Sequence, residues 1–456
     1  MAQHRFNFDL IIIGSGVGGS TAAIAAAQAG LKTAIVEANT FGGSALNDND
    51  IPLAALFQTA RLYDQARRGS RFGLSSTALR YNYPAINHFK DIAVKRSGGG
   101  GNRRFYDNLG VHAYSGLAHF LSPSEISVGN GHLSAKNFIV ATGAKFKEPD
   151  IKNLAAVKYL TPNDVKSLIR LPRSIFVIGG GRTGVELAQY FASLGSKVLI
   201  AERSARLLPS EDQEVGTLLG KIFNDDHGIK VLTKTKIVAV SSKAGVKKVT
   251  FMRGGEEKTI SVDEVLVATG MEPNTDIGLE NAGVKYTTQG IIVNDHLQTS
   301  LKNIYAVGDV INGHHSTSLA MAQGQWAVEN TLRRTKQPIP KVSAPNVTFT
   351  YPEVASVGLT EDDCLKRDIK IHKSLAPLST IARSGVSDFR DGFVKIITNH
   401  HGKVIGGSIV APEAGSMIHE LVIAVNHDLM ASDLVELPHA FMSWNEAIKV
   451  AAKKIK

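Results

Sequence analysis

Two segments of this 456-residue chain repeat one another, and this repeat constrains the fold more than any other feature. The first segment spans residues 14–37 as GSGVGGSTAAIAAAQAGLKTAIVE, and the second spans 179–202 as GGGRTGVELAQYFASLGSKVLIAE. Each follows an apolar strand-like run, continues through small residues typical of a helix, stops at Gly30 or Gly195, and resumes as a β-branched strand. The sequence therefore predicts two βαβ units.

A second repeat indicates where the two units close. The apolar runs Phe138–Gly143 and Val265–Gly270 both end in Ala-Thr-Gly. A third strand and turn, Ile304–Asp309, follows the second unit, which indicates that this unit is inserted into a discontinuous first domain. From about residue 345 the chain changes to strand-rich segments followed by two helical stretches, which is typical of a separate α+β domain.

These patterns predict an α/β fold with two Rossmann-like dinucleotide-binding domains and a C-terminal α+β domain. A chain of this length accommodates about three domains. The predicted bounds are 1–145 with 271–338 for the first domain, 146–270 for the inserted second domain and 339–456 for the third.

The glycine turn of the first unit has the spacing of a dinucleotide-binding site. Gly14, Gly16 and Gly19 form a GxGxxG motif after a strand and before a helix. Backbone amides and the helix N-terminus can therefore face a pyrophosphate. Glu37 ends the next strand, where its carboxylate can accept hydrogen bonds from ribose hydroxyls. In this context the motif indicates that the unit binds a dinucleotide.

The second unit repeats the motif with Gly179, Gly181, Gly184 and Glu202. Glu202 would repel a 2′-phosphate and accept from a free 2′-hydroxyl, which favours NADH over NADPH. Arg203 and Arg206 follow closely, and either can reach a 2′-phosphate, so NADPH stays an alternative. A solvated loop is the other interpretation of both arginines.

The order of these motifs resembles the pyridine nucleotide-disulfide oxidoreductases, especially their dihydrolipoamide dehydrogenase and mercuric reductase branch, over essentially the whole chain. The resemblance implies that the first unit binds FAD and the second binds NADH or NADPH. FAD rather than FMN is expected, because the first motif fits an adenosine diphosphate half that FMN lacks.

The same resemblance assigns further positions. It implies that Gly308 and Asp309 hold the ribityl and phosphate region of the flavin. The segment from Tyr351 to Gly358 resembles the start of the family's dimerisation domain, which implies a homodimer. The remaining positions expected to bind the cofactors are Gly43, Thr142, Gly143 and Gly270.

One segment departs from that family in a way that removes its chemistry. Residues 42–56 resemble the part that carries the redox-active cysteine pair beside the flavin, but Ala45 and Asp50 occupy the cysteine positions. An alanine methyl cannot attack a disulfide, and a carboxylate cannot form one. Cys364 is the one cysteine of the sequence, so an intrachain disulfide is excluded. It follows a helix-start motif at Thr360 and is expected to be structural or at the surface.

Two acids expected at the family's redox site are retained although their partners differ. Ala54 replaces a lysine that would pair with Glu186, so Glu186 needs another donor, such as Arg182 one helical turn earlier, or water. Phe441 falls where the family's general-base histidine lies, while Glu446 is retained. A histidine that deprotonates a dithiol has no use without cysteines.

A different alignment of the C-terminal segment stays open. Shifting it by two residues would make His439 the general base. The alternative interpretation of His439 is a structural or surface histidine.

The sequence thus predicts an FAD-dependent NAD(P)H oxidoreductase that passes electrons from the flavin directly to a small-molecule acceptor other than a disulfide. Quinones fit best, and quinone-reducing relatives without the disulfide are part of what the resemblance implies. Asp50 can lower the flavin potential as an anion, or protonate an acceptor if burial raises its pKa. The catalytic candidates are Asp50, Glu186 and Glu446.

Two other functions stay open. The chain can be a flavin-bound sensor or assembly protein that has lost turnover and uses the nucleotide to switch partners. It can also be a disulfide reductase that borrows a cysteine from a partner. Rapid bleaching of the flavin by NADH or NADPH without oxygen would distinguish an enzyme from a sensor.

Composition and histidine spacing limit the other partners. The 51 Lys and Arg against 41 Asp and Glu give a net charge of +10, but the excess is spread thinly, so no nucleic-acid partner is expected. No apolar run approaches about 18 residues and the N-terminus leads almost directly into a strand, so we expect no transmembrane segment and a cytoplasmic protein. His314 and His315 are adjacent and point apart in an extended chain, so no metal is expected. His400 and His401 precede a Gly-Lys turn and are expected at a hairpin tip.

Overall fold

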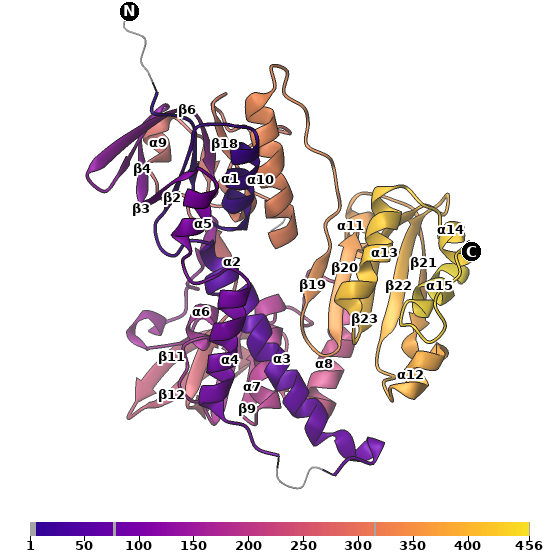
Figure 1. Cartoon of the computed structure of the whole chain (residues 1–456). Coiled ribbons are helices and arrows are strands. Elements are labelled where there is room, and N and C mark those ends of the chain that lie inside the picture. Colours follow the sequence, from indigo (N-terminus) through magenta and orange to yellow (C-terminus); the bar gives the residue numbers. More distant parts are fainter. Residues whose placement is uncertain (1–5, 76–78, 314–315, 456) are drawn as a thin grey trace, which may run out of the picture. The chain divides into compact units, whose positions relative to one another are not determined.

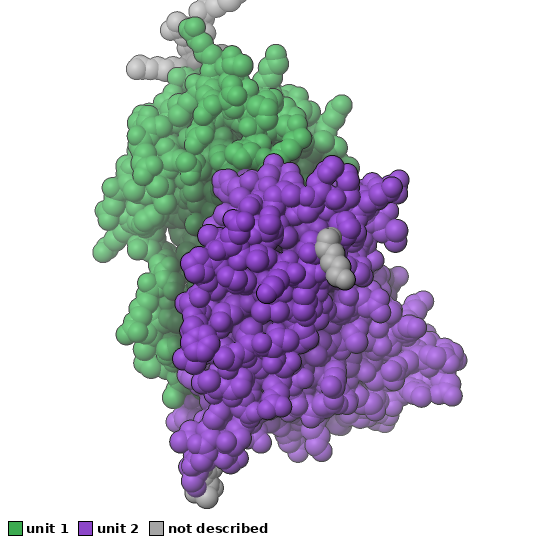
Figure 2. Space-filling model, turned by 90° about the vertical axis from the view of Figure 1, so that its right-hand side faces the viewer, with its two compact units in different colours: residues 1–55, 84–147, 271–341 green, residues 56–83, 148–270, 342–456 purple. Residues whose placement is uncertain are grey.

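The computed structural model describes residues 6–75, 79–313 and 316–455, and it divides into two compact units. Unit 1 contains residues 1–55, 84–147 and 271–341, and unit 2 contains residues 56–83, 148–270 and 342–456 (Figure 2). Both units are therefore discontinuous in sequence.

Unit 1 is built on a sheet whose parallel strands follow the order β3-β2-β1-β6-β18. Leu10, Ile11 and Ile12 of the central strand are fully buried, which explains why this strand is apolar on both faces. The strands are β1 Phe8–Ile13, β2 Thr33–Glu37, β3 His112–Ser115, β6 Gly131–Val140 and β18 Ile304–Ala306, with antiparallel β4 Ala118–Ser122 and β5 Glu125–Val128 beside β6.

Two helices of unit 1, α1 Val17–Gln28 and α10 Thr317–Leu332, pack closely against one another. A Cβ placed on Gly324 would lie 2.2 Å from the carbonyl oxygen of Gly18, so this close approach requires glycine. The segment that follows β2 forms α2 Gly43–Asn47, α3 Asp50–Arg67, α4 Tyr83–Arg96 and α5 Arg103–Asn108.

The nucleotide-binding part of unit 2 repeats the arrangement of unit 1. Its parallel sheet has the order β10-β9-β8-β14, which matches β3-β2-β1-β6 position by position. The elements are β8 Ser174–Ile178, α7 Arg182–Ser193, β9 Lys197–Ala201, α8 Gln213–His227, β10 Lys230–Leu232 and β14 Glu264–Val267, with a separate antiparallel sheet of β11 Thr235–Lys243, β12 Val246–Arg253 and β13 Glu256–Val262. The two predicted βαβ units are confirmed.

The C-terminal part of unit 2 is an antiparallel sheet of order β19-β20-β23-β22-β21 with helices packed on it (Figure 1). Its strands are β19 Asn346–Thr348, β20 Glu353–Gly358, β21 Ile371–Pro377, β22 Phe393–Asn399 and β23 Val404–Ala411, and its helices are α11 Glu361–Lys366, α12 Ala382–Val386, α13 Ala414–Asn426, α14 Ala431–Glu436 and α15 Glu446–Lys453. The last helix begins at Glu446, after a turn in which Met442 has a φ of 62°.

The structure confirms the predicted fold class. The short remaining elements are β7 Ala144–Phe146, β15 Met271–Pro273, β16 Tyr286–Thr287, β17 Gly290–Ile291, α6 Pro162–Val165 and α9 Leu279–Ala282. Across the three described ranges, every helix is too short or too polar to span a membrane.

Candidate active site

The first glycine turn is shaped for a pyrophosphate. Gly14 has a φ of 100°, and a Cβ on it would lie 2.3 Å from the carbonyl oxygen of Ala141. A Cβ on Gly19 would lie 1.9 Å from the carbonyl oxygen of Gly14, so both positions require glycine for packing. Around Gly16, in contrast, no described atom beyond Gly16 and its chain neighbours lies within 4 Å of such a Cβ. Gly16 therefore leaves an open space in front of its backbone at the start of α1, where a phosphate can approach.

Glu37 is held in a fixed orientation at the end of β2. Its carboxylate is 7% exposed and accepts hydrogen bonds from the Ser15 amide at 2.9 Å and the Ser15 hydroxyl at 2.6 Å. Its other oxygen accepts from the Asn39 amide at 2.8 Å. An anchored carboxylate beside the glycine turn fits the predicted recognition of ribose hydroxyls.

The other residues predicted to bind the flavin nucleotide lie around the same turn of unit 1. A Cβ on Gly43, which begins α2, would lie 2.4 Å from Cα of Gly16. The Thr142 hydroxyl donates to the carbonyl oxygen of Asn274 at 2.7 Å, which fixes the turn that contains Gly143. Gly308 has a φ of 74° and begins the short turn that carries Asp309. The structure thus brings the predicted FAD-binding set together in one unit.

The second glycine turn repeats the first. Gly179 has a φ of 110°, a Cβ on Gly184 would lie 2.0 Å from the Gly179 carbonyl oxygen, and no described atom lies within 4 Å of a Cβ on Gly181. Glu202 accepts from the amides of Gly180 at 2.8 Å and Ser204 at 2.7 Å. Gly270, with a φ of 125°, follows β14 in the same unit. Residues of both turns therefore fit a dinucleotide.

The two arginines that follow Glu202 differ in their surroundings. Arg203 is exposed and makes no side-chain hydrogen bond or ion pair with the described residues. The Arg206 guanidinium lies 3.2 Å from a carboxylate oxygen of Asp362 and donates to the carbonyl oxygen of Glu211 at 3.2 Å. Only the first arginine therefore matches the interpretation as a solvated loop residue.

The open space at Gly16 gives a test of the FAD site. Gly16→Val is expected to fold, since the position meets no atom, but to retain roughly tenfold less flavin, because the side chain would fill the space facing the pyrophosphate. The flavin-to-protein absorbance ratio and the circular dichroism of the purified variant measure the two effects. Gly19→Val is the matched variant and is expected to lose the fold itself. Full flavin content in folded Gly16→Val would contradict the placement of the site.

The segment that the sequence aligns with the family's cysteine pair contains the end of α2 and the start of α3. Ala45 lies within α2, and Asp50 is the first residue of α3. The Asp50 carboxylate is exposed and accepts a hydrogen bond from the Thr317 hydroxyl at 2.7 Å. An acidic side chain at a helix N-terminus is favourable as an anion. Asp50 is thus arranged as a solvated, hydrogen-bonded carboxylate.

Glu186 finds a partner that spacing along the chain does not reveal. It lies on α7, is 9% exposed, and accepts a hydrogen bond from the backbone amide of Phe349 at 2.7 Å. The sequence suggested Arg182 or water as the donor. Phe349 is 163 residues away, so only tertiary structure identifies it.

The contacts of the C-terminal loop support the alignment that assigns Phe441, rather than His439, to the position of the family's general base. Glu446 accepts from the backbone amide of Met442 at 2.9 Å and so caps the loop. The ring of His439 lies 2.8 Å from a carboxylate oxygen of Glu420, and the pair is largely buried. Phe441 is 75% exposed. His439 is therefore bound to an acid other than Glu446, which argues against the two-residue shift.

Cys364 is structural, as predicted. It is 1% exposed within α11, whose first turn has the predicted capping box at Thr360. Burial raises the pKa of its thiol, and Asp363 and Asp212 raise it further. A buried thiol with a raised pKa is a poor nucleophile.

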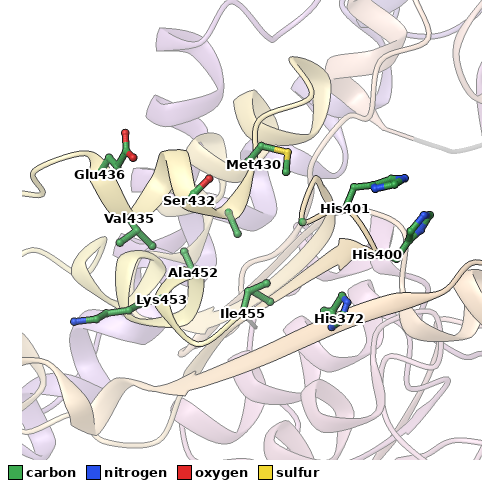
Figure 3. Close-up of a pocket in the computed structure, with 12 residues that line it drawn as sticks. His372, His400, His401, Met430, Ser432, Val435, Glu436, Ala452, Lys453 and Ile455 are labelled. Carbon is green, nitrogen blue, oxygen red and sulfur yellow. The ribbon is translucent and has the colours of Figure 1, made fainter.

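The histidines form no metal centre in the described ranges. His400 and His401 lie in the turn between β22 and β23, as predicted, and line an open pocket of about 530 Å³ together with His372 (Figure 3). No three histidine, cysteine or acidic side chains among the described residues come together as metal ligands. His314 and His315 lie outside the described residues.

The paired glycine turns and their anchored glutamates define a protein that binds two dinucleotides. Residues 8–324 match "Pyridine nucleotide-disulphide oxidoreductase", and residues 344–452 match the dimerisation domain of that family. The chain belongs to this family, and it is an FAD- and NAD(P)-dependent oxidoreductase by that membership.

Individual proteins show the same similarity. The chain is 35% identical over 461 residues to dihydrolipoyl dehydrogenase 2, mitochondrial, of Arabidopsis thaliana, which covers 97% of this chain and 89% of the relative. It is 31% identical over 456 residues to mercuric reductase of Bacillus cereus, which covers 98% of this chain and 72% of that protein. The crystal structure of LpdA from Mycobacterium tuberculosis matches with a TM-score of 0.86 and 26% identity, over 98% of this chain and 99% of that one.

Proposed function

We propose that this protein oxidises NAD(P)H and passes the electrons from FAD directly to an acceptor that is not a disulfide, with a quinone as the best-fitting class. One observation carries the proposal: the one cysteine of the sequence, Cys364, is buried in a helix of unit 2, while the sequence resemblance assigns Ala45 and Asp50 of unit 1 to the family's cysteine positions. A thiol relay between flavin and substrate therefore has no residues to form it.

The contribution of the protein is binding and orientation. FAD, when bound, supplies the acceptance of hydride from the nicotinamide and the release of electrons. The open backbone at Gly16 and Gly181 receives the two pyrophosphates, and Glu37 and Glu202 hold the two riboses. Because each glutamate is anchored by two backbone amides, the riboses are positioned without further ordering of side chains.

Asp50 is proposed to act on the reaction as an anion. Its carboxylate is exposed to water and accepts a hydrogen bond from the Thr317 hydroxyl. A negative charge in place of the family's flavin-proximal thiolate lowers the reduction potential of a nearby electron carrier. The alternative role, a buried acid that protonates an acceptor, has no support in this arrangement.

Three further parts of the proposal concern partners and cofactor. NADH is proposed as the preferred nucleotide, because a carboxylate at the position of Glu202 can accept from a free 2′-hydroxyl and repels a 2′-phosphate. A homodimer is proposed from the match to the dimerisation domain, and the 75% exposed Phe441 in that domain is suited to burial against a second copy. A cytoplasmic location is proposed from the sequence alone.

The route of the electrons can be tested with thiol reagents and a panel of acceptors. NADH added without oxygen is expected to bleach the flavin without the long-wavelength absorption that a thiolate beside an oxidised flavin produces. Quinone reduction is expected to survive thiol alkylation, because Cys364 has no role in it. Lipoamide and glutathione disulfide are expected to be unused. Steady-state oxidation of NADH at 340 nm measures each acceptor.

Three outcomes would oppose this assignment. Robust lipoamide reduction by the unaltered protein would show that it is a disulfide reductase. Loss of that activity in Cys364→Ser would show that Cys364 takes part in it. Absence of bleaching by both NADH and NADPH would favour the sensor function instead. Nicotinamide beside flavin can also give transient long-wavelength absorption, so the thiolate band is assigned by comparing alkylated with untreated protein.

A further inference from the structure

The loop after Glu202 returns to the second glycine turn. The amide of Leu208 donates to the carbonyl oxygen of Gly180 at 2.8 Å. A Cβ on Gly180 would lie 2.8 Å from side-chain atoms of both Glu202 and Leu207, so the two ends of the loop flank one backbone position. Arg206 immediately precedes Leu207. The loop therefore brings the residue after Arg206 to the same glycine turn that Glu202 contacts.

The side chain of Arg206 is nevertheless directed to other partners. Its stem packs on α8, where a Cβ on Gly216 would lie 3.2 Å from Cβ and Cγ of Arg206. Its guanidinium lies 3.2 Å from Asp362 and donates to the carbonyl oxygens of Glu211 at 3.2 Å and Pro209 at 3.5 Å. Nη2 of the guanidinium is thus held by groups of the loop and of the C-terminal domain, while Nε is buried without a hydrogen-bond partner among the described residues.

The acid that holds Arg206 is itself fixed in position. Asp362 lies in the first turn of α11, whose start is fixed by the Thr360 capping box. The amide of the preceding residue, Glu361, donates to a carboxylate oxygen of Asp212 at 3.0 Å. Asp212 directly precedes α8. α11 is therefore attached to the same loop, and Asp362 is presented to Arg206 by a rigid element.

We infer that Asp362, a residue of the C-terminal domain, sets the nucleotide preference of the second site by holding Arg206 away from a 2′-phosphate. Its negative charge also repels a phosphate dianion nearby. The inference rests on the proposed function, since it requires NAD(P)H at the second glycine turn. The choice of cofactor then depends on a side chain that follows Arg206 by 156 residues in the sequence, far beyond the glycine motif.

The exposure of Asp362 and Arg206 determines how much the nucleotide preference should change when the carboxylate is removed. Asp362 is 64% exposed and Arg206 is 23% exposed, so their ion pair is partly screened by water. A guanidinium binds a phosphate dianion more strongly than it binds a single carboxylate, because charge and paired donors both favour the phosphate. Removing the carboxylate is therefore expected to shift the binding preference toward NADPH by about tenfold. Exposed Arg203 is expected to add to the phosphate site once Arg206 is released.

The experiment measures binding rather than turnover. NAD⁺ and NADP⁺ differ only in the 2′-phosphate, and titration calorimetry of the flavin-loaded protein gives a dissociation constant for each. Asp362→Asn, which keeps the size of the side chain, is expected to raise the affinity for NADP⁺ relative to NAD⁺ about tenfold. Asp368→Asn changes the net charge equally near the end of α11 and is the matched control, expected to leave the ratio unchanged. The double variant Asp362→Asn with Arg206→Gln is expected to lose most of the gain.

The following results of the binding measurements would overturn the inference. An unchanged ratio in Asp362→Asn would show that Asp362 does not restrain Arg206. An equal gain in Asp368→Asn, or a gain that persists in the double variant, would show a general effect of charge. Binding of neither nucleotide to the unaltered protein would remove the second site and this inference with it. Failure of every electron acceptor, in contrast, would contradict the proposed reaction and leave these affinities unaffected.

Discussion

Replacing Ala45 and Asp50 by cysteines is expected to give at most feeble reduction of lipoamide, although it rebuilds the pair that the family uses. The dithiol would still lack a general base, because the sequence alignment assigns Phe441 to the position of the family's histidine and Glu446 is bound to the Met442 amide. A positioned base contributes roughly 10²–10⁴-fold to such a proton transfer. Adding Phe441→His to the cysteine pair is therefore expected to raise NADH-dependent lipoamide reduction by about that factor.

The controls separate the base from the local structure. Asp50→Cys removes the hydrogen bond from Thr317, so Thr317→Val with the original Asp50 measures the cost of that loss alone. Phe441→His without the cysteines is expected to reduce no lipoamide. Equal activity of the cysteine pair with and without Phe441→His would show that Phe441 does not stand in for the base. High lipoamide reductase activity of the unaltered protein would contradict the proposal that its electron acceptor is not a disulfide.

Local features made the nucleotide-binding folds predictable. Gly14 and Gly179 need left-handed backbone, and Gly19 and Gly184 have no room for a side chain, so the glycine spacing follows from sterics within one turn. The apolar runs before them are strands buried on both faces, as the burial of β1 shows. These constraints act over a few residues, and the sequence contains all of them.

The side-chain pairings were not predictable in the same way. Glu186 binds an amide 163 residues away, and Arg206 pairs with an acid 156 residues away. His439 pairs with Glu420, a partner that no sequence motif indicated. Such contacts depend on how separate elements pack, and a single sequence carries no periodic signal of that packing.

Lys395→Met is expected to destabilise unit 2 by about 3–5 kcal/mol at neutral pH. Lys395 is 1% exposed on β22, and its ammonium lies 3.2 Å from Asp212, 2.9 Å from Glu214 and in contact with Glu361. Burial alone would lower the pKa of Lys395, but hydrogen bonds to Glu361 and Glu214 raise it overall. The substitution would leave several carboxylates close together without their shared cation. Urea unfolding followed by the fluorescence of buried Trp444 measures the loss.

The pH dependence of that loss identifies its electrostatic origin. Burial raises the pKa of Glu361, but hydrogen bonds from Lys373 and Lys395 lower it overall from 4.5. A carboxylate with a lowered pKa stabilises the fold above its unfolded pKa and loses this contribution as pH falls through its folded pKa. A lysine with a raised pKa contributes below its usual 10.5 and loses the contribution as pH rises through the folded value. The difference in free energy of unfolding between Lys395→Met and the unaltered protein should therefore be largest between the pKa values of Glu361 and Lys395. It should shrink below pH 4.5.

A neighbouring lysine provides the matched comparison for this cluster. Lys373 also binds Glu361, but it is 53% exposed, so Lys373→Met is expected to cost at most about 1 kcal/mol. If Lys395→Met lowers the free energy of unfolding equally at pH 4 and pH 7, the cause is lost packing rather than lost charge. Because Asp212 also binds the amide of Glu361 beside Asp362, disruption of the cluster should additionally weaken the hold of α11 on the nucleotide loop. Lys395→Met is thus expected to shift the NADP⁺ to NAD⁺ affinity ratio in the same direction as Asp362→Asn, whereas Lys373→Met is not.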